Sequence, residues 1–179
     1  LDKYKVNNEV IVSNVDEDEI KNSLLSEGAS PLFISKNLAE IKSIKVSNQN
    51  PDRLVVGADS VISLNEELIN KPNSRKEAFD ILKKLNNSKH YLISSVCISK
   101  NGAMIWNHTN SSELKMKNLT DSELNTYLDK IDTKTLLAYG VYQIEAEGLE
   151  LFEYVKGDRD SIMGLPIKEI ISYIEKLKK

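Results

Sequence analysis

The chain has 179 residues, of which 40% are hydrophobic and 28% charged, and its formal net charge is −3. This length and composition predict one domain with a hydrophobic core, spanning residues 1–179. The slightly acidic balance argues against a nucleic-acid polymer as partner, and no apolar run reaches the roughly 20 residues of a membrane helix, so we expect no membrane partner.

The spacing of apolar residues divides the first half of the chain into six elements. They are a helix end at 1–5, a strand at 8–13, helices at 16–28 and 31–47, and the two strands of a hairpin at 53–64 and 67–71. Acidic residues open the first complete helix and Gly28 ends it, while Pro31 is suited to begin the next. This half therefore predicts helices followed by a strand pair.

The second half predicts a longer hairpin between helices. Its elements are a helix at 75–85, strands at 89–101 and 103–118, a helix at 121–130, two strands around Gly148, and a final helix from Pro166. Capping boxes open two of the helices, at 74–77 and 120–123, and Asn101-Gly102 is a strong hairpin signal. Because helices alternate with hairpin-joined strands, we expect the α/β (mixed α+β) class: a twisted mixed sheet with flanking helices.

Asp59 is a carboxylate inside an apolar strand pattern. A turn centred on Asn65 would place Lys71 opposite Asp59, with both side chains on one face of the hairpin. One interpretation is a structural ion pair. The other is a functional site, in which the carboxylate holds a divalent metal or a water and the lysine holds a phosphate. The pattern alone leaves both interpretations open, because a buried ion pair is weak evidence for a stabilising role.

The motifs occur in an order that resembles the Maf family of nucleotide pyrophosphatases over nearly the whole chain. The matching segments share position and type with the family's pattern. They are Val12-Ser13-Asn14-Val15 before the acidic run at 16–19, Leu38-Ala39 with Lys42, Gly57-Ala58-Asp59-Ser60, Lys71-Pro72, Ser88 with His90, Tyr142 to Glu145, Gly148, Leu151-Phe152, Gly157 and Met163 to Pro166.

The resemblance implies an enzyme with an active cleft between two lobes, usually a homodimer. Cys97 is the only cysteine, which fits a reducing, cytoplasmic location. The enzyme would hydrolyse a nucleoside triphosphate to the monophosphate and diphosphate with a divalent cation, Mg²⁺ or Mn²⁺. The resemblance implies that Asp59 is the proton acceptor or metal-organising carboxylate and that Glu17 is a second acidic group near the metal. Lys71 and Lys42 would bind phosphate or order the site. Gln143 and Glu145 would contact the nucleotide.

Two departures from the family pattern shape these expectations. The family's opening strand and its Ser/Arg loop have no counterpart before residue 1, so we expect the domain to be incomplete at its N-terminus. Ala138 stands where the family has a lysine, and Glu145 stands where it has a glutamine. A carboxylate there suits the N–H donors of a guanine edge, which favours a modified purine nucleotide such as 7-methyl-GTP.

Two other functions compete with the enzyme. The first is a non-catalytic nucleotide-binding regulator of cell division or septum formation, and the second is a structural or protein-interaction domain. Neither a P-loop nor a Gly-x-Ser-x-Gly motif occurs, so the sequence does not support P-loop or serine-hydrolase chemistry. His90, at a strand start, fits a structural histidine better than a catalytic one.

Overall fold

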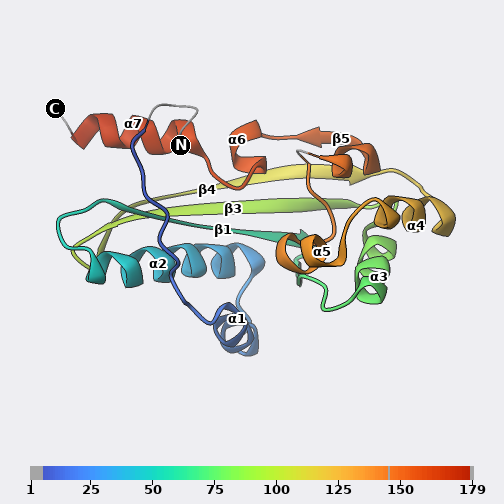
Figure 1. Ribbon diagram of the computed structural model, residues 1–179, viewed down its shortest axis with the longest axis horizontal. Helices are drawn as coiled ribbons and strands as arrows, with labels where there is room; N and C mark the ends of the chain where they lie inside the picture. The colour runs from blue at the N-terminus through green and yellow to red at the C-terminus, as the bar shows by residue number, and fades with distance from the viewer. Residues whose placement is uncertain (1–5, 145, 178–179) are drawn as a thin grey trace.

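The computed structural model describes residues 6–144 and 146–177, which form helices around one sheet (Figure 1). The elements in chain order are α1 (Glu17–Ser26), α2 (Pro31–Gln49), β1 (Val55–Leu64), β2 (Glu67–Ile69), α3 (Arg75–Leu85), β3 (Lys89–Lys100), β4 (Ala103–Met116), α4 (Asp121–Asp129), α5 (Thr133–Tyr139), the 3-10 helix η2 (Glu147–Leu151), β5 (Phe152–Lys156), α6 (Arg159–Ile162) and α7 (Ile167–Leu177). Within these ranges no helix is both long and apolar enough to span a membrane.

The sheet has the strand order β2-β1-β3-β4-β5, and every neighbouring pair is antiparallel. The α/β class is confirmed, while the sheet in the described residues is antiparallel rather than mixed. The short strand β2 pairs only with residues 62–64 of β1. The outer edge of β1 from residue 55 to 61 therefore faces no strand among the described residues.

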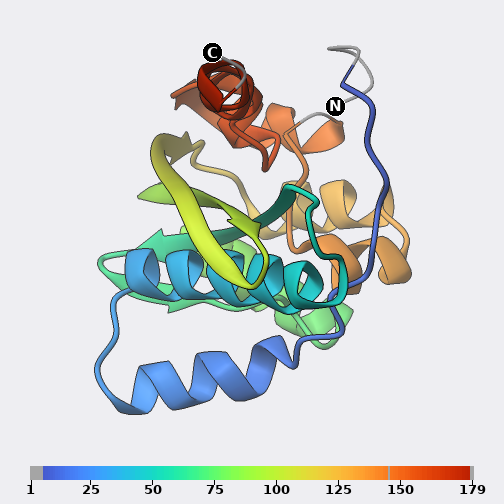
Figure 2. The same ribbon diagram turned by 90° about the vertical axis from the view of Figure 1, so that its left-hand side faces the viewer.

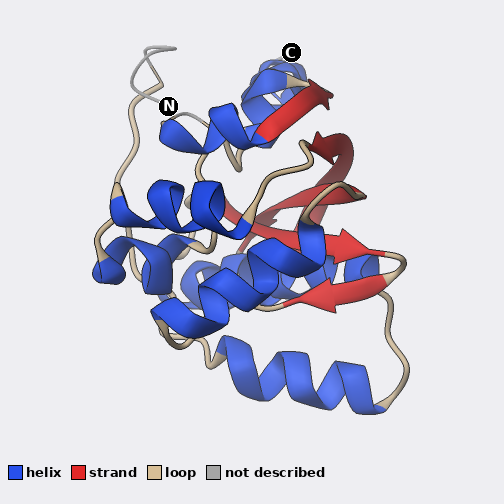
Figure 3. Cartoon of the chain, turned by 90° about the vertical axis from the view of Figure 1, so that its right-hand side faces the viewer, coloured by secondary structure: helices blue, strands red, loops and turns tan. Residues whose placement is uncertain are grey.

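Helices cover both faces of the sheet and one of its ends. Helix α2 lies against one face, α6 and α7 lie on the other, and α3, α4 and α5 gather at one end (Figure 1). Viewed from that end, helices lie above, below and to the left of the strands (Figure 3). The larger hydrophobic core fills this end, and a smaller cluster joins Val96 and Ile98 of β3 to Ile170 of α7.

Helix α2 packs unusually closely on β1 because Gly57 has no side chain. A Cβ at this position would lie 2.5 Å from the carbonyl oxygen of Ala39 and 2.7 Å from the backbone nitrogen of Ser43. Two serines of the helix add hydrogen bonds to the sheet: the Ser35 hydroxyl donates to the Asp59 carbonyl at 3.1 Å, and the Ser43 and Ser99 hydroxyls lie 2.8 Å apart. These contacts fix α2, and the side chains it carries, relative to β1.

Local sequence signals located most elements correctly. Asp16 and Ser30 cap α1 and α2, and Pro31 begins α2 as predicted. The Asn101-Gly102 turn joins β3 to β4, and the capping box at Thr120 is complete. At the first predicted box, Ser74 caps α3, but the Glu77 carboxylate accepts from the backbone of Asn73 instead of Ser74. The final helix begins one residue after Pro166.

Two strand predictions were wrong. Residues 8–13 are irregular, and Val10 and Val12 are 90% and 74% exposed, because no described strand pairs with this apolar run. Around Gly148 there is one strand, β5, preceded by η2. Gly148 lies against the backbone of Gln143, where a Cβ would be 2.4 Å from the carbonyl oxygen, so the chain folds back there instead of extending. The helix end expected at 1–5 lies outside the described residues.

Candidate active site

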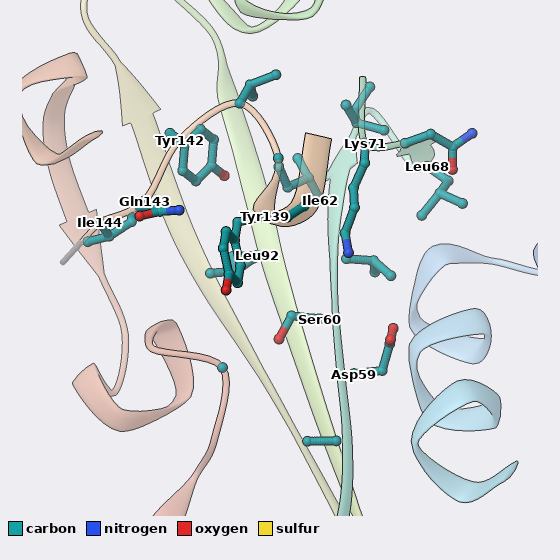
Figure 4. Close-up of a pocket in the computed structure, with 18 of the residues that line it drawn as sticks. Asp59, Ser60, Ile62, Leu68, Lys71, Leu92, Tyr139, Tyr142, Gln143 and Ile144 are labelled. Atoms are coloured by element: carbon teal, nitrogen blue, oxygen red, sulfur yellow. The ribbon is translucent and has the colours of Figure 1, made fainter. Parts of the chain in front are cut away.

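A cavity of about 360 Å³ opens beside the uncovered edge of β1 (Figure 4). This volume lies within the usual range for small-molecule sites. Asp59 and Ser60 extend to opposite sides of β1, so that the cavity has two sides. One side is charged and comes from α1, α2, β1 and the segment after β2. The other is largely aromatic and apolar and comes from the end of α5, the chain that follows it and the end of α6.

Lys42 joins the two acidic groups of the charged side. Its Nζ lies 2.7 Å from Glu17 Oε1 and 2.8 Å from Asp59 Oδ1. Glu17 is the first residue of α1, where the helix dipole favours a carboxylate, and Lys21 follows one turn later with its Nζ 3.7 Å from Glu17 Oε2. Lys71 lines the same cavity. Three lysines and two carboxylates thus meet at one end of the cavity.

Burial and pairing act differently on the charged groups. Asp59 is only 9% exposed, and burial raises the pKa of its carboxyl although Lys42 opposes the shift. Burial also disfavours the charged form of Glu17, but Lys42, Lys21 and Lys71 outweigh it and lower the Glu17 pKa. The pKa of Lys42 is raised: burial opposes this, but Asp59 and Glu17 stabilise the ammonium. At neutral pH Lys42 is therefore a cation between carboxylates.

The second carboxylate oxygen of Asp59, Oδ2, is buried and has no hydrogen-bond partner within the described residues. A buried acceptor without a partner costs free energy, so Oδ2 is suited to a ligand, a water or a cation. No group of three or more His, Cys, Asp or Glu side chains with metal-binding geometry occurs in the described ranges. Among the residues that line the cavity, Asp59 and Glu17 are the carboxylates that could hold Mg²⁺ or Mn²⁺, since Mg²⁺ commonly takes one or two carboxylates and completes its shell with phosphate oxygens and water.

The predicted pairing of Asp59 with Lys71 was wrong by one residue. Asn65 and Glu66 both adopt positive φ, so the turn centres between them and Ile62 pairs with Ile69. Strand β2 ends at Ile69, which leaves Lys71 beyond the ladder. Its side chain still extends along β1 toward the side that carries Asp59 (Figure 4). The two residues therefore share the cavity through the course of the loop after β2, not through strand pairing.

The other side of the cavity is built on Tyr142, which is 7% exposed. Its hydroxyl lies 2.9 Å from Nε2 of His90, a fully buried residue of β3, and its ring meets Phe152 edge-on with centroids 4.9 Å apart. Tyr139 and Gln143 lie beside it, in the cavity lining (Figure 4). Burial lowers the pKa of His90 to about 4, so this histidine is neutral and structural at pH 7. It does not line the cavity.

The structure thus places five of the six predicted site residues around one cavity: Glu17, Lys42, Asp59 and Lys71 on the charged side and Gln143 opposite. Glu145 lies outside the described residues. Sequence reasoning missed Lys21 and Tyr139. The spacing of Lys21, four residues after Glu17 on a predicted helix, was a signal that could have identified it. Tyr139 lies in a helix, α5, that was not predicted.

Comparisons with known proteins find relatives that match most of the chain. The family model described as Maf-like protein matches residues 1–177. The chain is 53% identical to a nucleoside triphosphate pyrophosphatase of Pelagibacter ubique, over 99% of this chain and 91% of that protein. It is 35% identical to a protein of the same name from Ruegeria pomeroyi, over 91% and 82% of the two chains. A 7-methyl-GTP pyrophosphatase of Brucella abortus is 31% identical, over 93% and 83%.

Proposed function

Because this chain belongs to the Maf-like protein family, we propose that it is a nucleoside triphosphate pyrophosphatase, which hydrolyses its substrate to the nucleoside monophosphate and diphosphate. The observation that carries the proposal is the buried Asp59 carboxylate at the edge of a nucleotide-sized cavity. Lys42 holds its Oδ1 atom, and its Oδ2 atom has no hydrogen-bond partner within the described residues. Relatives at 31–53% identity carry pyrophosphatase names.

The reaction needs a water oriented toward phosphorus and neutralisation of the phosphate charge. Asp59 Oδ2 is the acceptor for a proton of the attacking water, and the raised pKa of this carboxyl makes it a better base than an exposed aspartate. The new P–O bond forms at the α-phosphorus, and the bond to the bridging oxygen breaks to release diphosphate. Lys71 and Lys42 neutralise phosphate oxygens, and Lys42 also keeps Asp59 oriented.

Asp59 and Glu17 are the residues that would hold a divalent cation, Mg²⁺ or Mn²⁺. When bound, the cation would supply further neutralisation of the triphosphate. Asp59 Oδ2, which has no donor within the described residues, is suited to a proton or to a positive ligand, but not to both at once. Proton acceptor and metal-organising carboxylate are therefore alternative roles of Asp59.

For the base, we propose a modified purine nucleotide of the 7-methyl-GTP type. The name of the Brucella abortus relative supports it, as does the aromatic side of the cavity with the Gln143 amide. Glu145 would accept hydrogen bonds from the N–H groups of a guanine edge. We further propose a homodimer acting in the cytoplasm. A non-catalytic regulator of septum formation is not favoured, because the relatives have enzyme names.

The test is diphosphate release by the full chain with Mg²⁺ or Mn²⁺ over 7-methyl-GTP, GTP, dTTP, UTP and CTP. Asp59→Asn preserves the shape of the side chain but removes the base, so we expect turnover to fall at least about 100-fold. Asp80→Asn, at an exposed position of α3, is the matched control and should retain full activity. Thermal unfolding of both variants checks that each is folded. Undiminished release by folded Asp59→Asn would refute the role of Asp59.

A further inference from the structure

Two tyrosines line the aromatic side of the cavity, and Tyr139 is the more exposed of the two. The side chain is 71% exposed, yet it belongs to the cavity lining. It is the last residue of α5, and Gly140 follows with φ of +97°, which turns the chain sharply toward Tyr142. In Figure 4 the Tyr139 ring extends toward the side of β1 that carries Ser60. An aromatic face is thus offered to whatever occupies the cavity.

Tyr142 and Tyr139 differ in what holds them. Tyr142 is buried, tied to His90 by its hydroxyl and packed against Phe152, so its ring is a fixed part of the wall. Tyr139 is largely open to solvent. Around it, the apolar side chains Ile62 and Leu92 line the floor of the cavity. The fixed ring shapes the wall, and the exposed ring has a face available for stacking.

We propose that Tyr139 stacks on the nucleobase and selects a purine that carries positive charge, as N7-methylated guanine does. The inference rests on the proposed function and names the residue that sets its substrate preference. Base–aromatic stacking stabilises bound nucleotides, and an aromatic ring attracts a delocalised cation more strongly than a neutral base.

The distribution of charge in the cavity supports this orientation of the nucleotide. Its lysines, Lys21, Lys42 and Lys71, all come from the charged side, where they would hold the triphosphate. The segments that line the aromatic side, 138–144 and 162–164, contain no lysine or arginine. A cationic base at Tyr139 would therefore meet no fixed positive charge among these residues. When the triphosphate is bound at the lysines, the base would lie on the aromatic side of the cavity.

The experiment measures equilibrium binding instead of turnover, by calorimetry with the full chain. The probes are the α,β-methylene analogue of GTP, which resists hydrolysis, its N7-methylated form, and inorganic tripolyphosphate, which has no base. The variants are Tyr139→Phe, which keeps the ring, and Tyr139→Leu, which removes it. Tyr91→Leu is the matched control, because Tyr91 is an exposed tyrosine of β3 outside the cavity.

We expect Tyr139→Leu to weaken binding of the methylated analogue about tenfold and to reduce its advantage over the unmethylated analogue roughly threefold. Tyr139→Phe and Tyr91→Leu should bind like the wild type, and tripolyphosphate should bind all variants equally. Unchanged nucleotide binding by Tyr139→Leu, or an equal loss for tripolyphosphate, would overturn the stacking role. If folded wild-type protein binds neither nucleotides nor tripolyphosphate, the proposed function itself fails and this inference with it.

Discussion

The buried histidine behind the cavity makes the stability of the protein depend on pH. His90 is fully buried, and burial lowers its pKa from 6.5 to about 4. As the pH falls below 6.5, the unfolded chain binds a proton at this histidine while the folded chain does not. Protonation therefore favours unfolding, and the stabilising contribution of neutral His90 is present above pH 6.5 and lost as the pH falls toward 4.

The size of the effect follows from these two values. Between pH 7 and pH 5 the free energy of unfolding should fall by about 2 kcal/mol on account of His90, and the full loss below both values is about 3 kcal/mol. Urea denaturation followed by fluorescence of Trp106, the only tryptophan, measures this quantity at a series of pH values.

A variant separates the contribution of His90 from that of other groups. His90→Gln remains neutral throughout, so it should lose about 2 kcal/mol less than the wild type between pH 7 and pH 5, whatever its stability at pH 7. Identical pH profiles for the wild type and His90→Gln would show that burial of His90 does not disfavour its charged form.

Two further predictions concern the charged side of the cavity. Lys21→Met should lower kcat/KM about tenfold, since it removes a cation next to Glu17. The free energy of unfolding in urea should stay nearly unchanged, because α1 has no buried residues. A normal kcat/KM would exclude a role for this lysine. Gly57→Ala should destabilise the fold by about 1–3 kcal/mol and also reduce activity, because the added Cβ pushes α2, and Lys42 with it, away from β1. Urea denaturation and diphosphate release test the pair of effects, and a variant with wild-type stability would contradict the close packing.

Local signals in the sequence were sufficient for the elements whose ends they determine. The turn at Asn101-Gly102 and the caps of α1, α2 and α4 depend on a few neighbouring residues, and all are present. The run at 8–13 shows the limit of this reasoning. Its apolar residues fit a strand, but a strand also needs a partner, and partners are set by tertiary structure. The short helices α5 and α6 have too few residues for a periodic pattern.

The candidate site was predictable where motif and position coincide, as at Asp59 and Lys42. Their 2.8 Å contact was not, because it depends on the approach of α2 to β1 at Gly57. The register of Asp59 against Lys71 failed for a local reason: both turn residues adopt positive φ, which shifts the pairing by one position.

The two sides of the cavity come from different parts of the gene. The charged side is encoded between residues 17 and 71 and most of the aromatic side between 138 and 164, with the long hairpin of β3 and β4 between them. Viewed along the sheet, α1 and α2 lie together at one side of the molecule, away from the C-terminal helices (Figure 2). On the proposed assignment, mutations in the later segment would change the preferred base and leave the hydrolytic groups of the earlier segment intact. Such a division would allow the specificity for the base to change independently of the hydrolytic groups.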